Sequence, residues 1–176
     1  MCKKLAPLVV MGVCGCGKST IGALLGERLG LPFSDGDDYH PLANKMKMAQ
    51  GAPLDDEDRW PWLAEIGAAL ADTSDGAESR IIACSALKRR YRDLLRNHAP
   101  DVVFIHLSGD PATLSARLAG REHEYMPSTL LQSQLATLEA PGTDEAHLVL
   151  DIGEDPDSLV DQVLAHLNAG SLSRPS

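Results

Sequence analysis

Aromatic residues, basic residues and long apolar runs are all scarce in this chain of 176 residues. Aromatics make up 4% of the sequence, so the core has to be built mainly from Leu, Val, Ile and Ala. Lys and Arg number 16 against 25 Asp and Glu, and the net charge of −9 disfavours nonspecific nucleic-acid binding, which depends on basic residues. No apolar run approaches the length of a membrane span. The first residues also lack the separate apolar region of a signal peptide, so we expect a cytoplasmic protein without nucleic-acid or membrane partners.

Cysteine is also rare, with four in the chain: Cys2, Cys14, Cys16 and Cys84. The C-x-C spacing has no second pair or nearby histidine, which makes a zinc site a poor interpretation. A disulfide framework fits badly with a cytoplasmic protein. We interpret Cys14 and Cys16 as small residues that matter through their backbone N–H groups. The positive environment expected around these two residues would nevertheless lower a thiol pKa, which gives the hypothesis that thiol reagents inactivate the protein.

Residues 12–19, GVCGCGKS, fit the phosphate-binding pattern G-x-x-x-x-G-K-[ST] at every fixed position. Glycines let the backbone curl so that successive N–H groups point at an anion. Lys18 is placed to reach the β- and γ-phosphates, and the Ser19 hydroxyl to ligate Mg²⁺. An apolar strand over 8–11 precedes this loop and a helix over 20–29 follows it, so the helix dipole favours phosphate. We predict a nucleoside triphosphate site formed by Gly12, Val13, Cys14, Gly15, Cys16, Gly17, Lys18, Ser19 and Thr20.

An acidic cluster, DGDDYH over residues 35–40, follows a short second strand over 32–34. Ligands of open α/β sheets bind beyond the carboxyl ends of the strands, which places this cluster beside the phosphate loop. One carboxylate is suited to hold Mg²⁺ through water, and another to orient or deprotonate an attacking hydroxyl. The third strand, over 80–83, does not end in Asp, which shifts the metal role toward Asp35 or Asp37. The alternative is a solvated acidic turn that caps a helix from about residue 41.

Several basic side chains are expected to line the same cleft. Arg59 follows the acidic run 55–58, and a fixed guanidinium suits a substrate carboxylate. The acidic run itself is expected to cap a helix that carries Pro61 in its first turn. Lys88 and Arg92 follow the carboxyl end of the third strand and are expected to face the cleft together with Ser85.

The second half of the chain continues the alternation of strands and helices. A strand over 102–107 contains His106, which we interpret as a packed residue. Two helices around a polar loop with Arg117 and Arg121 predict a lid over about 117–132, whose arginines close on the γ-phosphate and exclude water. The alternative is an exposed helical hairpin. The chain ends with a strand over 147–152, a turn over 153–157 that would flank the adenine, a final helix and a flexible tail over 170–176. We therefore expect a single domain over 1–176 of the parallel α/β class.

Several blocks, in family order from residue 9 to about 152, resemble the gluconokinase family. They are MGVCGCGKS (11–19), DGDDYH (35–40), PLDDEDRWPWL (53–63), CSALK (84–88), YRDLLR (91–96), SQ (133–134) and TLEAPG (137–142). The combination of D-G-D-x-x-H, D-R-x-P-W-L and C-S-A-L-K is far more specific than the phosphate loop alone. Cysteine stands at positions 14 and 16 where serine is commoner in the family.

The resemblance implies ATP-dependent phosphorylation of D-gluconate at its 6-hydroxyl, giving 6-phosphogluconate and ADP. It also implies the three-layer α/β/α P-loop kinase fold, similar to nucleoside monophosphate kinases, with a helical lid, and a homodimer. Lys18, Asp37 and Arg121 are then the catalytic residues, with Asp37 orienting or deprotonating the 6-hydroxyl. Ser19 and Asp35 belong to the Mg²⁺ site. The residues implied in gluconate binding are Asp37, His40, Lys45, Arg59, Lys88 and Arg92.

Two other functions stay open at this point. A related P-loop kinase, such as a shikimate kinase, shares the loop and the lid but should lack the D-R-x-P-W-L and C-S-A-L-K blocks. A non-catalytic nucleotide-binding protein would bind ATP or GTP without an acceptor pocket. The residues alone do not separate gluconate from shikimate, adenylylsulfate or a nucleotide as the acceptor.

Overall fold

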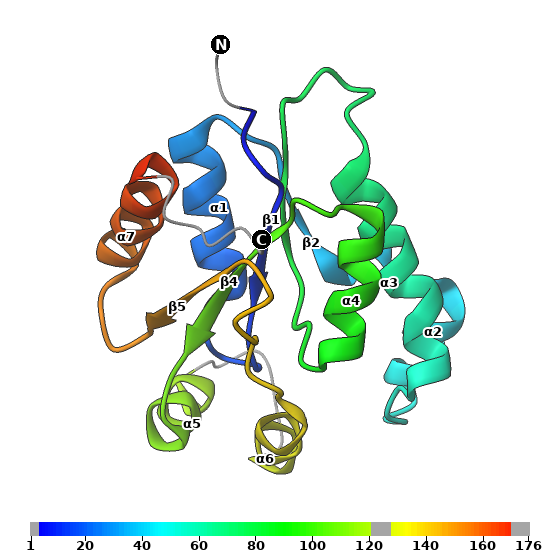
Figure 1. The fold of residues 1–176 in the computed structure, drawn as a ribbon. Helices are drawn as coiled ribbons and strands as arrows, with labels where there is room; N and C mark the ends of the chain where they lie inside the picture. Colours follow the sequence, from blue (N-terminus) through cyan, green and yellow to red (C-terminus); the bar gives the residue numbers. More distant parts are fainter. Residues whose placement is uncertain (1–3, 121–127, 170–176) are drawn as a thin grey trace.

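A parallel sheet forms the centre of the protein. The structure, a computed structural model, describes residues 4–120 and 128–169. All strand pairs are parallel, in the order β2-β3-β1-β4-β5 (Figure 1). The parallel α/β fold predicted from the alternating strands and helices is therefore confirmed. The strands are β1 (Leu8–Met11), β2 (Phe33–Asp35), β3 (Ile81–Ala83), β4 (Val103–Ser108) and β5 (His147–Asp151).

Helices cover both faces of this sheet. Helices α1 and α7 lie on one face and α3 and α4 on the other, while α5 and α6 lie beyond the carboxyl ends of the strands (Figure 1). The helices are α1 (Lys18–Leu29), the 3₁₀ turn η1 (Gly36–Tyr39), α2 (Leu42–Ala49), α3 (Asp56–Ala71), α4 (Arg89–His98), α5 (Pro111–Ala119), α6 (Ser128–Thr137) and α7 (Pro156–Ala169). None of the helices in the described ranges has the length and apolar character needed to cross a bilayer.

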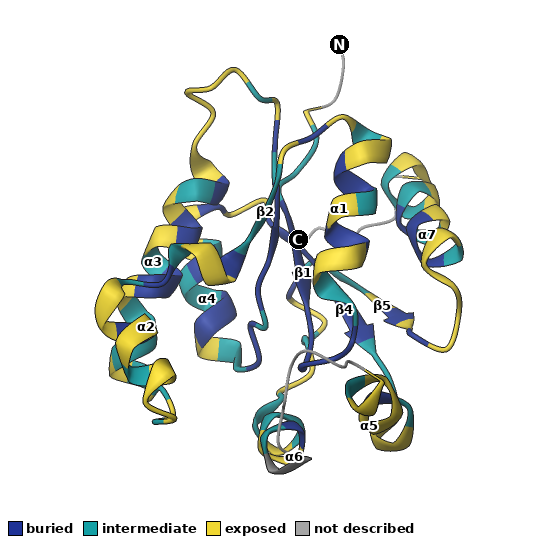
Figure 2. Ribbon diagram, turned by 180° about the vertical axis from the view of Figure 1, so that it is seen from behind, coloured by how far each residue is buried: buried dark blue, intermediate teal, exposed yellow. Residues whose placement is uncertain are grey.

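Two hydrophobic cores sit on the two faces of the sheet because strand side chains alternate. Leu8 and Val10 of β1 belong to the core under α1 and α7, and Val9 and Met11 to the core under α3 and α4. The inner faces of these helices are buried while their outer faces are exposed (Figure 2). Leu138, just after α6, packs against both cores. His106 of β4 is 5% exposed, as expected for a packed strand residue.

Helix α3 differs from the sequence-based expectation. It begins at Asp56, so the acidic run forms its first turn and Pro61 lies inside the helix and not in the first turn. The cause is a reciprocal cap, in which the Asp55 carboxylate accepts the Asp58 N–H at 2.8 Å and the Asp58 carboxylate accepts the Asp55 N–H at 3.0 Å. Proline lacks the N–H that would bond the carbonyl of Glu57 one turn earlier, which removes one bond from the helix.

The predicted lid is described only at its two flanks. Helix α5 ends at Ala119 and α6 begins at Ser128, with the Asp110 carboxylate capping α5 by accepting the Thr113 N–H at 2.8 Å. Residues 121–127 lie outside the described residues, and so does the predicted tail over 170–176. The lid and the flexible tail therefore stay predictions.

Candidate functional site

Glycines shape the phosphate loop, residues 12–19, between β1 and α1. Gly12 has a φ of 145°, and a Cβ there would lie 2.7 Å from the Cys16 Sγ and 2.8 Å from a carbonyl oxygen of β4. Gly17 adopts the left-handed conformation, with a φ of 94°, directly before α1. Lys18 folds back over the loop, and its Nζ donates to the Val13 carbonyl oxygen at 3.1 Å. The loop therefore offers an ammonium group and a helix N-terminus to an anion, the arrangement that binds phosphate.

Ser19 and Asp35 meet at the mouth of this loop. The Ser19 hydroxyl of α1 donates to the Asp35 Oδ2 at the end of β2 at 2.9 Å. The Asp35 Oδ1 accepts the N–H of Asp37 at 3.0 Å, which fixes the carboxylate. Hydroxyl and carboxylate oxygens suit Mg²⁺, an ion that keeps several waters and needs few protein ligands, so the pair fits the predicted metal site. Within residues 4–120 and 128–169, no three or more His, Cys, Asp or Glu gather into a possible metal site.

His40 is buried next to the carboxylate of Asp37. Its imidazole stacks on the Trp62 ring at a centroid separation of 4.2 Å, and its Nδ1 lies 3.2 Å from the Asn44 Nδ2. The Asn44 amide also donates to the Asp58 carbonyl oxygen at 2.9 Å, which identifies its nitrogen as the donor. His40 Nδ1 is therefore the acceptor, and the network assigns the proton of the neutral ring to Nε2. The Nε2 lies 3.9 Å from the Asp37 Oδ1.

The charge state of this histidine follows from its surroundings. Burial, and then the positive charges of Arg59 and Lys45, lower the pKa of His40. Lys45 itself is exposed on α2. Because the ordinary pKa of histidine is 6.5, the lowered pKa keeps the ring neutral at pH 7. The Asp37 side chain is 85% exposed, so the carboxylate beside this neutral ring is open to a ligand.

Arg59 and Lys88 both face the ring of Tyr91. The Arg59 guanidinium carbon lies 5.6 Å and the Lys88 Nζ 5.5 Å from the ring centroid. Asp56 joins them, since its carboxylate accepts from the Tyr91 hydroxyl and from the Lys88 Nζ, the latter at 3.3 Å. Arg90 pairs with the other oxygen of the same carboxylate. Burial and then the hydrogen bond to Asp56 raise the pKa of Tyr91 to about 12, so the phenol stays protonated.

Asp56 is a residue that sequence reasoning missed. The run 55–58 was assigned to helix capping, which is correct for Asp55 and Asp58. The hydrogen bond from Tyr91, followed by the contacts with Lys88 and Arg90, lowers the pKa of Asp56. These contacts join α3 to α4 across about thirty residues, a separation at which helical periodicity gives no signal.

Three of the predicted site residues gather around Cys84, directly after β3. The charges of Lys18, Asp37 and Arg59 all act on its thiol. Burial dominates over these charges and raises the pKa of Cys84 to about 12. Lys18 from the phosphate loop, Asp37 from η1 and Arg59 from α3 thus lie at one edge of the sheet, as the strand-end rule predicts.

Arg92 does not join this group, which corrects the expectation that it faces the cleft. Its side chain is fully buried in α4, and its Nε donates to the equally buried Glu145 carboxylate at 3.0 Å. Its Nη1 donates to the carbonyl oxygens of Ala86 and Leu87 at 2.8 and 3.3 Å. The Nε and Nη1 groups are therefore hydrogen-bonded inside the protein, while the buried Nη2 has no hydrogen-bond partner among the described residues. Arg121, the predicted lid arginine, lies outside the described residues.

A pocket of about 390 Å³ opens on the other side of the phosphate loop. Arg117 of α5 closes part of this pocket. Its Nη2 donates to the Ile152 carbonyl oxygen, and its Nη1 lies 3.9 Å from the position that a Cβ on Gly17 would take. Pro156, in the turn that the sequence placed next to adenine, lines the same pocket. The lining is Gly15, Cys16, Gly17, Thr20, Ile21, Ala116, Arg117, Gly120, Glu154, Pro156 and Leu159.

Cys16, in the phosphate loop, is not an activated thiol. Cys14 and Cys16 are both buried, at 8% and 1% exposure. Burial raises the pKa of Cys16, and the opposing effect of the Lys18 charge is smaller. The expectation that the positive environment lowers a thiol pKa is therefore wrong for Cys16, because removal of the thiolate from water outweighs the attraction.

Comparisons with known proteins give one consistent answer. A family profile described as shikimate kinase matches residues 14–168. The gluconokinase of Gluconobacter oxydans (strain 621H) is 43% identical over 162 residues, covering 92% of this chain and 91% of that protein. The thermosensitive gluconokinase of Escherichia coli (strain K12) is 44% identical over 155 residues, covering 88% and 83%. A solved structure of a gluconokinase from Sinorhizobium meliloti 1021 matches with a TM-score of 0.86 and 43% identity, covering 95% and 94%.

Proposed function

Because the chain belongs to the gluconokinases, a group within the shikimate-kinase type of P-loop domain, we propose that it transfers the γ-phosphoryl group of ATP to D-gluconate. The acceptor atom is the 6-hydroxyl, and the products are 6-phosphogluconate and ADP. The observation that carries this proposal is that gluconokinases at 43% and 44% identity match 92% and 88% of the chain. A match of this extent favours gluconate over shikimate as the acceptor.

The nucleotide occupies the phosphate loop and the pocket beside it. Residues 12–20 form the cradle of the triphosphate, and Lys18 neutralises charge at the β- and γ-phosphates. Ser19 and Asp35 would hold Mg²⁺, which supplies further charge neutralisation to the phosphoryl group. The adenine fits the pocket of about 390 Å³ between α5 and the turn at Pro156. Support for this half of the site comes from the Ser19–Asp35 hydrogen bond of 2.9 Å.

The acceptor lies on the opposite side of the loop, near η1 and α3. Asp37 receives the proton of the 6-hydroxyl, and the Nε2–H of the neutral His40 lies 3.9 Å from that carboxylate. Arg59, Lys88 and Lys45 bind the carboxylate and hydroxyl groups of gluconate. The convergence of Lys18, Asp37 and Arg59 around Cys84 supports this placement. A catalytic role for Arg121 rests on the family resemblance alone.

The first experiment measures ADP release with MgATP and, in turn, gluconate, shikimate, adenosine monophosphate or no acceptor. Stimulation by gluconate alone is the expected result. Stimulation by shikimate instead would keep the kinase and discard the acceptor. Binding of ATP without stimulation by any acceptor would favour the non-catalytic nucleotide-binding protein.

The position of transfer is tested on the product. The 6-hydroxyl is the primary alcohol of gluconate, so the phosphorus of a phosphate there couples to the two protons of C6. It therefore gives a triplet in the proton-coupled ³¹P spectrum. A doublet would place the phosphate on a secondary hydroxyl and contradict transfer to the 6-position.

We also propose that the protein works in the cytoplasm as a homodimer. Buried cysteine thiols and a need for ATP fit a reducing compartment. Leu42 and Met46, one turn apart on α2, are 72% and 56% exposed and offer an apolar surface for association. Light scattering of the purified protein at micromolar concentration distinguishes one chain of 18.8 kDa from two.

A further inference from the structure

Helix α6 occupies a central position between the two halves of the site. It lies beyond the carboxyl ends of the strands, where both halves meet (Figure 1). Leu131 anchors it in the core under α1 and α7 at 2% exposure. Leu138, directly after the helix, packs against that core and also against the core under α3 and α4. The helix is thus held against both layers of the protein.

Helix α6 contacts the phosphate loop through the side chain of Gln134. The N–H of Cys14 donates to the Gln134 Oε1 of α6 at 2.7 Å, across 120 residues of sequence. Gln134 is half-buried. The side chain of a helix far along the chain therefore holds the backbone of the loop that binds ATP.

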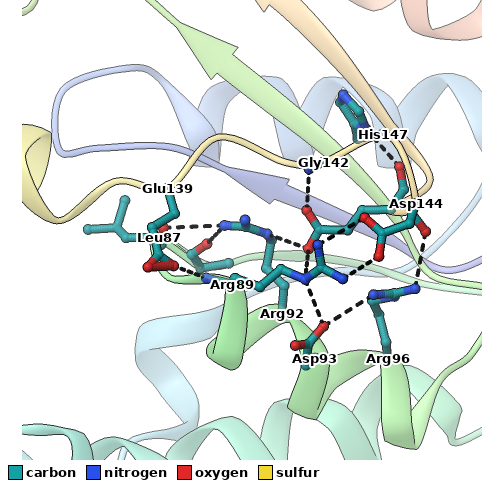
Figure 3. Close-up of polar contacts among 11 residues, drawn as sticks. Leu87, Arg89, Arg92, Asp93, Arg96, Glu139, Gly142, Asp144 and His147 are labelled. Atoms are coloured by element: carbon teal, nitrogen blue, oxygen red, sulfur yellow. Dashed lines mark hydrogen bonds and ion pairs between the residues drawn. The ribbon is translucent and has the colours of Figure 1, made fainter.

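The other end reaches the acceptor loop, residues 84–88. The N–H of Glu139 donates to the Leu87 carbonyl oxygen at 2.8 Å, and the N–H of Arg89 donates to the Glu139 Oε2 at 2.6 Å (Figure 3). These two bonds enclose Lys88, which carries one of the proposed acceptor contacts. Five residues along the chain therefore separate the contact with the phosphate loop from the contact with the acceptor loop.

Carboxylates of the following turn reinforce the acceptor end. The Glu145 Oε1 accepts from the Arg92 Nε at 3.0 Å, and the Glu145 Oε2 accepts the Gly142 N–H at 2.8 Å. Asp144 receives both terminal nitrogens of Arg89 in a bidentate pair (Figure 3). Since Arg92 also donates to the carbonyl oxygens of Ala86 and Leu87, the turn and the acceptor loop form one connected unit.

We propose that α6 and residues 138–145 form a brace that fixes the phosphate loop relative to the acceptor loop, with Gln134 and Glu139 as positioning residues for phosphoryl transfer. A displacement of about 1 Å can cost on the order of a hundredfold in the rate of in-line transfer, so a rigid link between the two loops raises the transfer rate without contacting either substrate. This proposal rests on the proposed function for its acceptor, gluconate.

The first test replaces Gln134 by Met, which keeps the length of the side chain and removes the acceptor of the Cys14 N–H. The expected result is a kcat lower by on the order of tenfold, with the KM for gluconate and the melting temperature unchanged. The matched control is Gln132→Met, at an exposed position of the same helix, which should leave kcat at the wild-type value. An unchanged kcat in Gln134→Met overturns the proposal, as does a fall in melting temperature with normal kcat.

A conservative variant separates positioning from loss of packing. Gln134→Glu keeps an oxygen that accepts the Cys14 N–H but adds a negative charge near the triphosphate. We expect kcat to recover toward the wild-type value while the KM for ATP rises. A kcat as low as that of Gln134→Met would show that the hydrogen bond is not what matters, and would overturn the role of Gln134.

A double-mutant cycle tests whether the two ends act as one brace. Removal of the contact at either end frees the two loops from each other, so removal of the second contact should lower kcat little further. Glu139→Ala combined with Gln134→Met is therefore expected to lose about the same tenfold in kcat as either single variant. A roughly hundredfold loss, the product of the single effects, would show two independent contacts and overturn the brace.

An acceptor-independent measurement keeps this proposal separate from the proposed function. Amide hydrogen exchange at Arg89 and Glu139 reports the acceptor end directly, because these two N–H groups form its hydrogen bonds. MgADP should slow exchange at both amides in the wild type and leave it unchanged in Gln134→Met. Equal slowing of exchange in both proteins, or no slowing in the wild type, overturns the brace. Absence of gluconate-dependent turnover by itself overturns only the proposal that gluconate is the acceptor.

Discussion

The Arg92 guanidinium and the Glu145 carboxylate form an ion pair in which both side chains are fully buried, with Nε and Oε1 3.0 Å apart. The two residues join α4 to the turn before β5, 53 positions apart in the sequence. A buried charge that loses its partner is strongly unfavourable. Without its partner the Glu145 carboxylate would keep, among the described residues, only the longer contact of 3.5 Å with the Arg89 Nε and the N–H of Gly142.

Arg92→Met should therefore lower the free energy of unfolding by about 3–5 kcal/mol, measured by urea denaturation. Combining it with Glu145→Leu removes both charges and should recover a large part of that loss. The KM for gluconate distinguishes this role from acceptor binding. A stable Arg92→Met protein with a greatly raised KM would return Arg92 to the acceptor site.

Lys18→Ala should reduce turnover by on the order of a hundredfold or more, because the ammonium group that neutralises the transferring phosphoryl is lost. Circular dichroism and the melting temperature should match the wild type, since Lys18 is half-buried and its Nζ donates to the loop backbone of its own turn. Near-normal turnover would contradict the assignment of the phosphate loop.

Asp37→Asn should lower kcat on the order of a hundredfold while the affinity for ATP changes little, because the amide no longer accepts the proton of the attacking hydroxyl. The matched control is Asp38→Asn, at the neighbouring exposed position of η1, which should keep kcat near the wild-type value. Equal kcat values for the two variants would remove Asp37 from the reaction.

Arg59→Ala should raise the KM for gluconate roughly 10- to 100-fold, which corresponds to one lost hydrogen bond to a charged group. The KM for ATP measured on the same protein is the internal control and should stay within about twofold. If both constants rise together, Arg59 shapes the whole site and does not bind the acceptor.

The pH dependence of stability can be tested independently of the site. Burial, and then the charges of Arg92 and His147, lower the pKa of His106 below its ordinary 6.5. Below about pH 6.5 His106 becomes protonated in the unfolded chain, whereas in the folded chain protonation needs a lower pH. The free energy of unfolding therefore falls as the pH drops below that value. His106→Gln should reduce this fall by up to about 1.4 kcal/mol per pH unit, while His40 keeps its own contribution. An identical slope in the variant between pH 7 and pH 5 would contradict a lowered pKa.

Much of the site was predictable from sequence because strand ends converge. The phosphate-binding pattern predicts Ser19 at the metal, and the position after a strand of the same sheet predicts Asp35 or Asp37 there; the hydrogen bond of 2.9 Å shows that Ser19 and Asp35 meet. Lys18 and Asp37 also follow strands of this sheet, whereas Arg59 lies on α3. These inferences need the order of elements and the direction of the strands, both of which hydrophobic patterning supplies.

One error comes from a tertiary partner that no local pattern reveals, and another from a local cap that was not recognised. Arg92 was placed in the cleft because it follows β3 closely, but the orientation of α4 turns it toward Glu145, whose position depends on the turn at 142–145. Pro61 was placed in a first turn because the reciprocal cap of Asp55 and Asp58 was not recognised. In each case the deciding contact is a specific pair of side chains or caps, which composition and periodicity do not encode.

Leu138, which packs against both cores, also bears on how the protein comes apart. In a sandwich whose two layers share only the sheet, each helical layer is free to melt on its own. A side chain inserted into both layers makes the loss of either layer expose apolar surface in the other. The two helical layers are therefore coupled and unfold in a single cooperative transition. Leu138 contributes to this coupling in addition to the sheet.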